Sequence, residues 1–298
     1  MGHHHNKGLA RKNLLISILL NSGITLAQAI GGFISGSLSL LSDALHNFTD
    51  VISLIISYVA HIFAKKKASL HKTFGYKRAE IIAAFINAST LIVISILLII
   101  EAVERFFNPQ EIKSELVIWL SIAAIIVNGF SVLLLKKDSR LNMNMRSAYL
   151  HLLTDMMASV AVLAGGLFMK YFNWYWIDPL LTFAIAVYLI IVGIDLLKNS
   201  FNVLMLFTPE DIPIKEIVKQ ISVIEEVKNV HHIHIWQLNE EEVHLEAHID
   251  FHKDISLSDF DLILERIEKI VHNDFGINHV NIQPEYNKPD DKDVIVQD

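Results

Sequence analysis

Two short stretches of the sequence pair a histidine with an aspartate four residues later, inside long apolar runs. The first pair is His46 and Asp50, and the second is His151 and Asp155. On a helix, residues four apart project from one face, one turn apart. A single such residue is explained equally well by a hydrogen bond to a neighbouring helix. Four ionisable residues at matching positions in membrane helices are costly, and this repetition favours a shared ligand.

The chemistry of this set is that of a metal site. Two imidazole nitrogens and two carboxylate oxygens suit tetrahedral Zn2+ or a similar borderline cation. A divalent ion would also neutralise the two carboxylates and make their burial tolerable. Because an imidazole must be deprotonated to bind metal, metal arrival releases protons and low pH expels metal. With histidine titrating near ~6.5, the set favours exchange of cytoplasmic Zn2+ for protons.

The composition is that of a membrane protein with a soluble portion. The 298 residues are 52% hydrophobic and 19% charged, and the mean hydropathy is +0.41. Cysteine is absent, which excludes disulfides and thiolate metal ligands. No basic tract suggests nucleic acid, and no phosphate-binding Gly-x-x-x-x-Gly-Lys-Ser/Thr motif suggests an ATP-driven pump. No cleavable signal is evident, so we expect the first apolar run to stay in the membrane.

Hydrophobic runs of about 20 residues or more predict six membrane spans. They are Asn13 to Ile34, Leu38 to Ala64, Ile81 to Phe107, Leu116 to Leu135, Ala148 to Phe172 and about Ile177 to Val203. Basic residues gather before the first span, after the second and fourth, and after the sixth. By the positive-inside rule both termini are cytoplasmic, including a polar tail over residues 1–12 that carries His3 to His5.

A soluble domain is predicted after the transport domain of residues 13–207. Apolar stripes at helical spacing mark Ile214 to Ile221 and Phe260 to Val271, and the alternation over Val243 to Phe251 marks a strand. With strands at Val230 to Leu238 and His279 to Glu285, the order is helix, strand, strand, helix, strand. This predicts a small α+β sandwich over residues 208–288, followed by a tail over residues 289–298.

Five motifs together resemble the cation diffusion facilitator family, particularly its bacterial cadmium, cobalt and zinc exporters. They are Ser42 to Asp50, Thr73 to Glu80, Tyr149 to Asp155, Asp178-Pro179 and Val230 to Trp236. The resemblance implies six transmembrane helices, a cytoplasmic ferredoxin-like domain, a homodimer and proton-coupled metal efflux across a bacterial plasma membrane. Lipid, protons and divalent ions are then the partners, and no organic cofactor is expected.

The resemblance also assigns residues to sites. It implies a transport site of His46, Asp50, His151 and Asp155. Manganese-specific relatives usually carry Asp at the first of these positions, so His46 favours Zn2+, with Cd2+ or Co2+ as further substrates. The resemblance implies that Zn2+ also serves as a structural or regulatory ion in the cytoplasmic domain, held by His231, His248 and Glu285, with His234 and Asp261 as further candidates.

Three features of the chain differ from this pattern. Ser69, Lys72 and Tyr76 stand where some relatives have an additional Asp and His site, so no metal is expected there. Leu206-Phe207 stands where many relatives are acidic, so a charge pair with the basic loop between the second and third spans is not expected. Finally, His231 shares strand parity with apolar Ile233, so it would have to act from the start of its strand.

Two other classes of protein compete with a transporter. An intramembrane zinc hydrolase would also bury His and Asp, but it keeps an open coordination position beside a general base, and no His-Glu-x-x-His occurs. A metal receptor would bind the ion without moving it. The cytoplasmic domain would favour export when cytoplasmic zinc tightens its dimer, provided that zinc binds the two states with different affinity.

Overall fold

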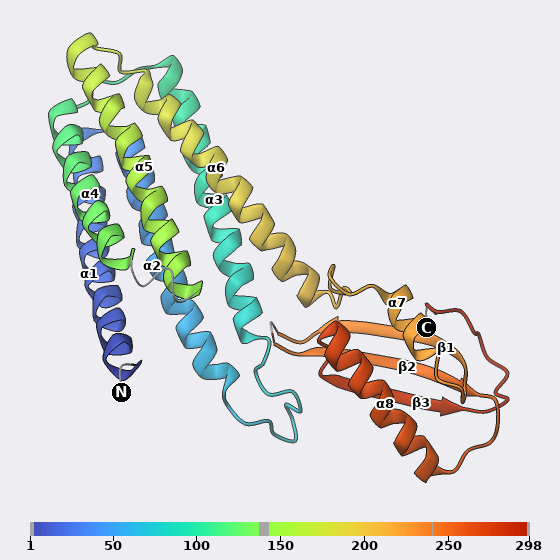
Figure 1. Cartoon of the computed structure of the whole chain (residues 1–298). Coiled ribbons are helices and arrows are strands. Elements are labelled where there is room, and N and C mark those ends of the chain that lie inside the picture. Colours follow the sequence, from blue (N-terminus) through green and yellow to red (C-terminus); the bar gives the residue numbers. More distant parts are fainter. Residues whose placement is uncertain (1–2, 137–142, 240, 297–298) are drawn as a thin grey trace. The chain divides into compact units, whose positions relative to one another are not determined.

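The computed structural model describes residues 3–136, 143–239 and 241–296. Within these residues, six helices are long and apolar enough to cross a membrane (Figure 1). They are α1 (His3–Ser35), α2 (Leu38–Ala64), α3 (Ala79–Phe107), α4 (Ser114–Leu135), α5 (Met143–Phe172) and α6 (Ile177–Leu204). All six predicted spans are therefore present as helices. Helix α1 begins at His3, within the residues that were predicted as a polar tail.

The chain divides into two compact units, each built from more than one stretch of the sequence. One unit comprises residues 1–56 and 86–195, and the other comprises residues 57–85 and 196–298. The second unit thus contains the soluble domain together with the end of α2, the start of α3 and the last turns of α6. All four predicted transport ligands belong to the first unit.

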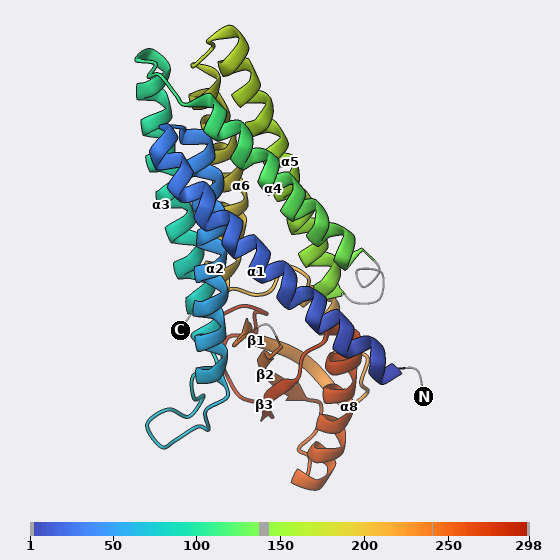
Figure 2. The same cartoon turned by 90° about the vertical axis from the view of Figure 1, so that its left-hand side faces the viewer.

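Small residues allow the helices of the first unit to approach closely. Helix α4 lies against both α1 and α5 (Figure 2). A Cβ atom at Gly32 of α1 would lie 3.1 Å from the backbone of Leu41 in α2, and one at Gly166 of α5 would lie 3.0 Å from the side chain of Ile118 in α4. In a bilayer, where apolar burial does not draw helices together, such close backbone packing holds a bundle.

A buried carboxylate joins the first turns of α6 and α2. Asp178 is fully buried and accepts hydrogen bonds from the Ser37 hydroxyl at 2.6 Å, the Ser39 hydroxyl at 2.5 Å and the Leu38 amide at 2.7 Å. The amides at the start of a helix lack intrahelical acceptors and carry partial positive charge. Asp178 lies in the first turn of its own helix, and its side chain also caps the helix that carries His46 and Asp50.

The soluble domain has the predicted order of elements. It contains α7 (Ile214–Ile221), β1 (Val227–Gln237), β2 (Val243–Phe251), α8 (Leu257–Phe275) and β3 (His279–Glu285). Strand β2 is central, antiparallel to β1 and parallel to β3. This is a ferredoxin-like arrangement without an opening strand. Helix α8 is capped by the Ser256 side chain and ends at Gly276 with φ 69°, the left-handed conformation that glycine favours.

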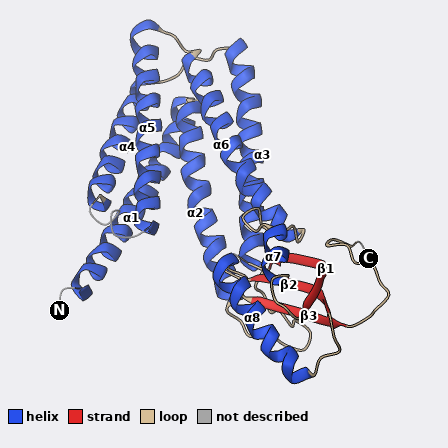
Figure 3. Ribbon diagram, turned by 45° about the vertical axis from the view of Figure 1, so that its right-hand side comes forward, coloured by secondary structure: helices blue, strands red, loops and turns tan. Residues whose placement is uncertain are grey.

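The two faces of the sheet have different roles. Leu245, Ala247 and Ile249 of β2 are buried in one apolar core with residues of α7 and α8, and Figure 3 shows the helices beside the strands. Because side chains alternate along a strand, His248 and Asp250 lie on the opposite face. The sheet therefore presents its ionisable residues away from the helices that supply the core.

Asp178→Ala should destabilise the first unit because it leaves the first turn of α2 without its acceptor. Loss of a helix cap costs about 1–2 kcal/mol. The measurement is the thermal unfolding midpoint of the purified protein in detergent. Asp195→Ala is the matched control, since Asp195 is an exposed carboxylate on the same helix. Equal midpoints for the two variants would contradict the capping role.

Candidate metal sites

The structure brings the four predicted transport ligands together on α2 and α5. His151 Nε2 lies 3.3 Å from Asp50 Oδ2 and 3.5 Å from Asp155 Oδ2. His46 Nε2 lies 3.6 Å from the same Asp50 oxygen, and the two imidazole rings are 6.0 Å apart. The four side chains thus form a continuous chain of contacts, in which each helix contributes one His and one Asp.

Several polar atoms of this set are buried and lack a hydrogen-bond partner among the described residues. They are Nδ1 of His46, Oδ2 of Asp50 and both carboxylate oxygens of Asp155. A buried carboxylate without a donor or cation is costly, so these atoms require a bound cation or protons. Because the ligands are on two separate helices, a relative shift of α2 and α5 changes every distance between a ligand on one helix and a ligand on the other.

Asp43 lies one turn before His46 on the same helix and is buried. Its Oδ2 accepts a hydrogen bond from Gln28 of α1 at 2.7 Å and another from Ser159 of α5 at 3.4 Å. These bonds link three helices beside the four ligands. Asp43 therefore fixes the relative positions of α1, α2 and α5 through hydrogen bonds between spans.

A second cluster lies on the face of the sheet opposite the helices. Ligand atoms of His231, His248, Glu285 and Asp290 all lie within 4.8 Å of one another. His231 Nε2 is 3.3 Å from Glu285 Oε2, and His248 Nδ1 is 3.1 Å from Glu285 Oε1. The structure thus brings together the three predicted residues His231, His248 and Glu285, whereas His234 and Asp261 lie outside this group.

An irregularity in β1 explains how His231, which alternates in step with the apolar Ile233, reaches this face. The strand begins at Val227, so the prediction that it starts at Val230 is wrong. The β1–β2 register shifts between His231 and His234, and His232 has φ 50°. A bulge of this kind changes the alternation of side chains. Consequently His231 lies inside the strand and not at its start, pairs with His248 of β2, and is fully buried on the face that carries the ionisable residues.

Sequence reasoning missed the contribution of the C-terminal tail to this cluster. Asp290 belongs to the residues predicted only as a tail, yet its Oδ2 lies 3.8 Å from His231 Nε2. Two lysines also enter: Lys288, just before the tail, donates to Glu285 Oε1 at 2.6 Å, and Lys292 of the tail donates to Glu285 Oε2 at 3.0 Å. The dense charge of residues 288–293 was the available signal in the sequence.

The surroundings lower the pKa values of both His248 and Glu285 in this cluster. Burial lowers the pKa of His248; nearby cationic and imidazole groups act in the same direction, and the Glu285 carboxylate opposes them. Burial by itself would raise the pKa of Glu285, but hydrogen bonds from Lys288, Lys292 and Gln283 outweigh it and lower that pKa. At neutral pH, His248 is therefore neutral and Glu285 is ionised, which are the protonation states that a metal requires.

The basic loop between α2 and α3 does carry a charge pair, with a partner that the sequence did not suggest. Lys77 Nζ donates to both carboxylate oxygens of Glu242, at 2.5 and 2.6 Å. Glu242 directly precedes β2. The pair is partly exposed, with 41% of the Lys77 side chain and 31% of the Glu242 side chain accessible, so its net stabilisation is modest.

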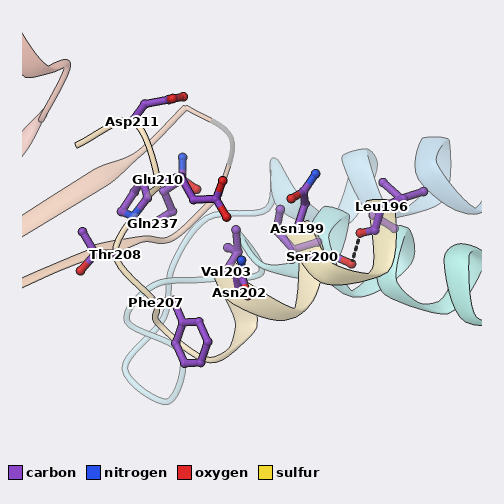
Figure 4. A pocket seen from close by; sticks show the side chains of 13 residues that line it. Leu196, Asn199, Ser200, Asn202, Val203, Phe207, Thr208, Glu210, Asp211 and Gln237 are labelled. Carbon is purple, nitrogen blue, oxygen red and sulfur yellow. Dashed lines mark hydrogen bonds between the residues drawn. The ribbon is translucent and has the colours of Figure 1, made fainter. Parts of the chain in front are cut away.

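A pocket of about 420 Å3 lies at the end of α6 (Figure 4). Residues of the last turns of α6 line it, together with Phe207 to Asp211 and Gln237. Its described lining residues include none of the candidate metal ligands. The pocket carries the acidic side chains of Glu210 and Asp211, and Glu210 is paired with Lys198 at 3.0 Å.

The fold and these ligand sets define a class: a six-helix membrane protein with His and carboxylate clusters both between its helices and on a soluble α+β domain. The chain belongs to the cation efflux family. Residues 14–205 match the transmembrane domain of cation efflux proteins, and residues 209–287 match their cytoplasmic domain, which is a dimerisation domain.

Similarity to individual proteins extends over nearly the whole chain. The cadmium, cobalt and zinc/H(+)-K(+) antiporter of Bacillus subtilis is 39% identical over 287 residues, covering 96% of this chain and 92% of the relative. Zinc transporter ZitB of Escherichia coli is 34% identical, covering 92% and 87%. The metal cation efflux system protein CzcD of Cupriavidus metallidurans is 33% identical, covering 95% and 89%. These names describe transporters, and membership of their family excludes the enzyme interpretation.

The lowered pKa of His248 leads to a testable expectation. A histidine with an unperturbed pKa titrates near ~6.5, and burial places the midpoint for His248 lower. The stability that this neutral histidine contributes is therefore fully present above ~6.5 and is lost as pH falls through the lower, folded-state pKa. Exchange of the imidazole C2 hydrogen, followed by mass spectrometry across pH, measures this midpoint in the metal-free protein. A midpoint at or above ~6.5 would contradict the effect of burial.

Proposed function

We propose that the protein exports Zn2+ from the cytoplasm in exchange for protons, through a site formed by His46, Asp50, His151 and Asp155, with Cd2+ or Co2+ as further substrates. The observation that carries this proposal is the convergence of the four side chains, with buried carboxylate oxygens that lack partners. Two nitrogens and two carboxylate oxygens suit a borderline divalent ion. The transporter names of the relatives support the same substrate class.

Proton exchange follows from the chemistry of these ligands. Metal requires neutral imidazoles and ionised carboxylates, so protonation and metal binding exclude each other at the same atoms. With metal bound, two carboxylates balance a divalent charge; without it, protons on the same residues reduce the cost of burying the carboxylates. The protein can therefore change the side of the membrane to which the site opens with either metal or protons bound. The antiporter name of the Bacillus subtilis relative supports this exchange.

We further propose that the soluble domain is cytoplasmic, forms a homodimer and binds a regulatory Zn2+. The residues fit such an ion: ligand atoms of His231, His248, Glu285 and Asp290 lie within 4.8 Å of one another, and Nδ1 of His248 is buried without a hydrogen-bond partner among the described residues. His231, His248, Glu285 and Asp290 would hold the ion, which would join β1, β2, β3 and the tail. Both chain termini lie in the cytoplasm of a bacterium in this arrangement, as the basic loops indicate.

Asp155→Ala should abolish zinc transport, because it removes one of the two carboxylates that balance the charge of the ion. The measurement is Zn2+ uptake into proteoliposomes containing purified protein and a fluorescent zinc indicator. Thr154→Val is the matched control, since Thr154 is an exposed neighbour whose hydroxyl donates to the Leu150 carbonyl of its own helix. We expect a loss of at least tenfold for the first variant and near-normal uptake for the second. Zinc binding without uptake by the unaltered protein would instead indicate a receptor.

An imposed pH gradient should drive zinc accumulation against its own concentration gradient. Vesicles loaded at low pH and diluted into zinc at higher pH should accumulate Zn2+, because protons leaving through the site return it in the form that binds metal. Collapsing the pH gradient with a protonophore should stop this accumulation. Uptake that is equal with and without the gradient would overturn the exchange mechanism and leave facilitated diffusion.

A further inference from the structure

The C-terminal tail places an ammonium group inside the cluster of His231. Lys292 Nζ lies 3.3 Å from His231 Nε2, 3.1 Å from Asp250 Oδ1 and 3.0 Å from Glu285 Oε2, and it also contacts Asp290. One imidazole nitrogen and three carboxylates thus surround a single cationic atom. This is the kind of ligand set that a divalent metal would draw from the same residues.

The hydrogen bonds of Lys292 define the ring nitrogen of His231 for which a metal would compete with the ammonium group. An ammonium group has only donors, so His231 Nε2 must offer its lone pair to Lys292. The other ring nitrogen then carries the proton and faces Asp250 Oδ2 at 3.7 Å. A histidine that binds a metal through one ring nitrogen usually donates the N–H of its other ring nitrogen to a carboxylate. Lys292 therefore occupies the lone-pair position that a metal requires.

The backbone of the same segment is attached to the exposed edge of β1. The amide of His232 donates to the Asp293 carbonyl at 3.1 Å, and the amide of Ile233 donates to the Val294 carbonyl at 2.9 Å. Asn229 adds a side-chain hydrogen bond to the Lys292 carbonyl at 3.4 Å. The ammonium group and the edge pairing are thus adjacent parts of one strap, defined here as residues 288–296.

We propose that Lys292 is a built-in occupant of the cytoplasmic metal site, that Zn2+ must displace it, and that its displacement releases the strap from Lys292 onward from β1. Zn2+ and Lys288 together balance the charges of Asp250, Glu285 and Asp290, so Lys292 is no longer needed once the metal is bound. Asp290 remains as a ligand, and the strap opens beyond it. Metal in the cytoplasm is thereby converted into a change at the edge of the sheet.

This inference rests on the proposed regulatory site, and Lys292 raises the concentration of Zn2+ that is needed to fill that site. An ammonium group within hydrogen-bonding distance of the ligands repels an incoming cation and holds the ligand lone pairs. The unaltered site should therefore bind Zn2+ more weakly than its ligands alone would allow. The Lys292 side chain is 34% exposed, so a departing ammonium group has a direct path into water.

The test measures zinc affinity and strap release in the full-length protein in nanodiscs. Every protein carries His46→Ala, Asp155→Ala and alanine at His3 to His5, so that zinc reports on the soluble domain. Lys292→Met keeps the length of the side chain and removes its charge, whereas Lys292→Arg keeps the charge. Lys269→Met is the matched control, because Lys269 is an exposed lysine of α8. His231→Ala removes the site itself.

Competition with a fluorescent zinc chelator should show that Lys292→Met binds Zn2+ at least about tenfold more tightly than the unaltered site. Lys269→Met should leave the affinity unchanged, and Lys292→Arg should resemble the unaltered site. Thermal unfolding of the metal-free variants verifies that each is folded. Unchanged or weaker zinc binding by folded Lys292→Met would overturn the inference. If His231→Ala binds as tightly as its parent, the proposed regulatory site itself is absent.

Amide hydrogen exchange supplies the second readout. Zn2+ should speed exchange at His232 and Ile233, whose amides donate to the strap, and it should have no such effect in His231→Ala. Exchange at these two amides should already be fast in metal-free Lys292→Met. Slower exchange with zinc in the unaltered protein would show that metal tightens the strap, and it would overturn the release while leaving the metal site intact.

Discussion

The free-energy cost of burying carboxylates away from water is the physical constraint on which this structure depends. Asp178 meets it with hydroxyl and amide donors at the start of α2. Glu285 meets it with Lys288 and Lys292. The oxygens of Asp155 have no described hydrogen-bond partner at all. Backbone and hydroxyl donors hold Asp178 in a structural role, whereas a carboxylate that is unsatisfied, or satisfied only by lysines that can be displaced, is available to an ion or a proton.

The two candidate metal sites differ in the way their ligands are held. The membrane set is divided between α2 and α5, and its side chains contact one another in sequence. The soluble set has its ligand atoms within 4.8 Å of one another; three of its residues lie on strands whose register is fixed by backbone hydrogen bonds, and Asp290 comes from the tail. An exporter must release its substrate on each cycle, which suits ligands on movable helices. Ligand atoms that already lie close together require less ordering when metal arrives.

Local backbone features decide which residues take part in each site. The bulge at His232 turns His231 to the ionisable face, and without it His231 would lie among the apolar residues packed under α7 and α8. In the membrane part, Gly32 allows α1 to reach the start of α2, and Asp43 then ties both to α5 through Gln28 and Ser159. The ligands are therefore positioned by residues that carry no metal chemistry themselves.

The sequence by itself determined the six spans, the order of elements in the soluble domain and the paired motifs of His46 and His151. These features depend on hydrophobic runs, periodicity and helical spacing, all of which are local. Only the tertiary structure decided that Asp178 caps a second helix, that Lys77 pairs with Glu242, and that Lys292 enters the cluster of His231. Each of these contacts joins residues far apart in the chain, or depends on a bulge or on the path of the tail. Composition and spacing do not encode such long-range geometry, because it is set by how the packed elements meet.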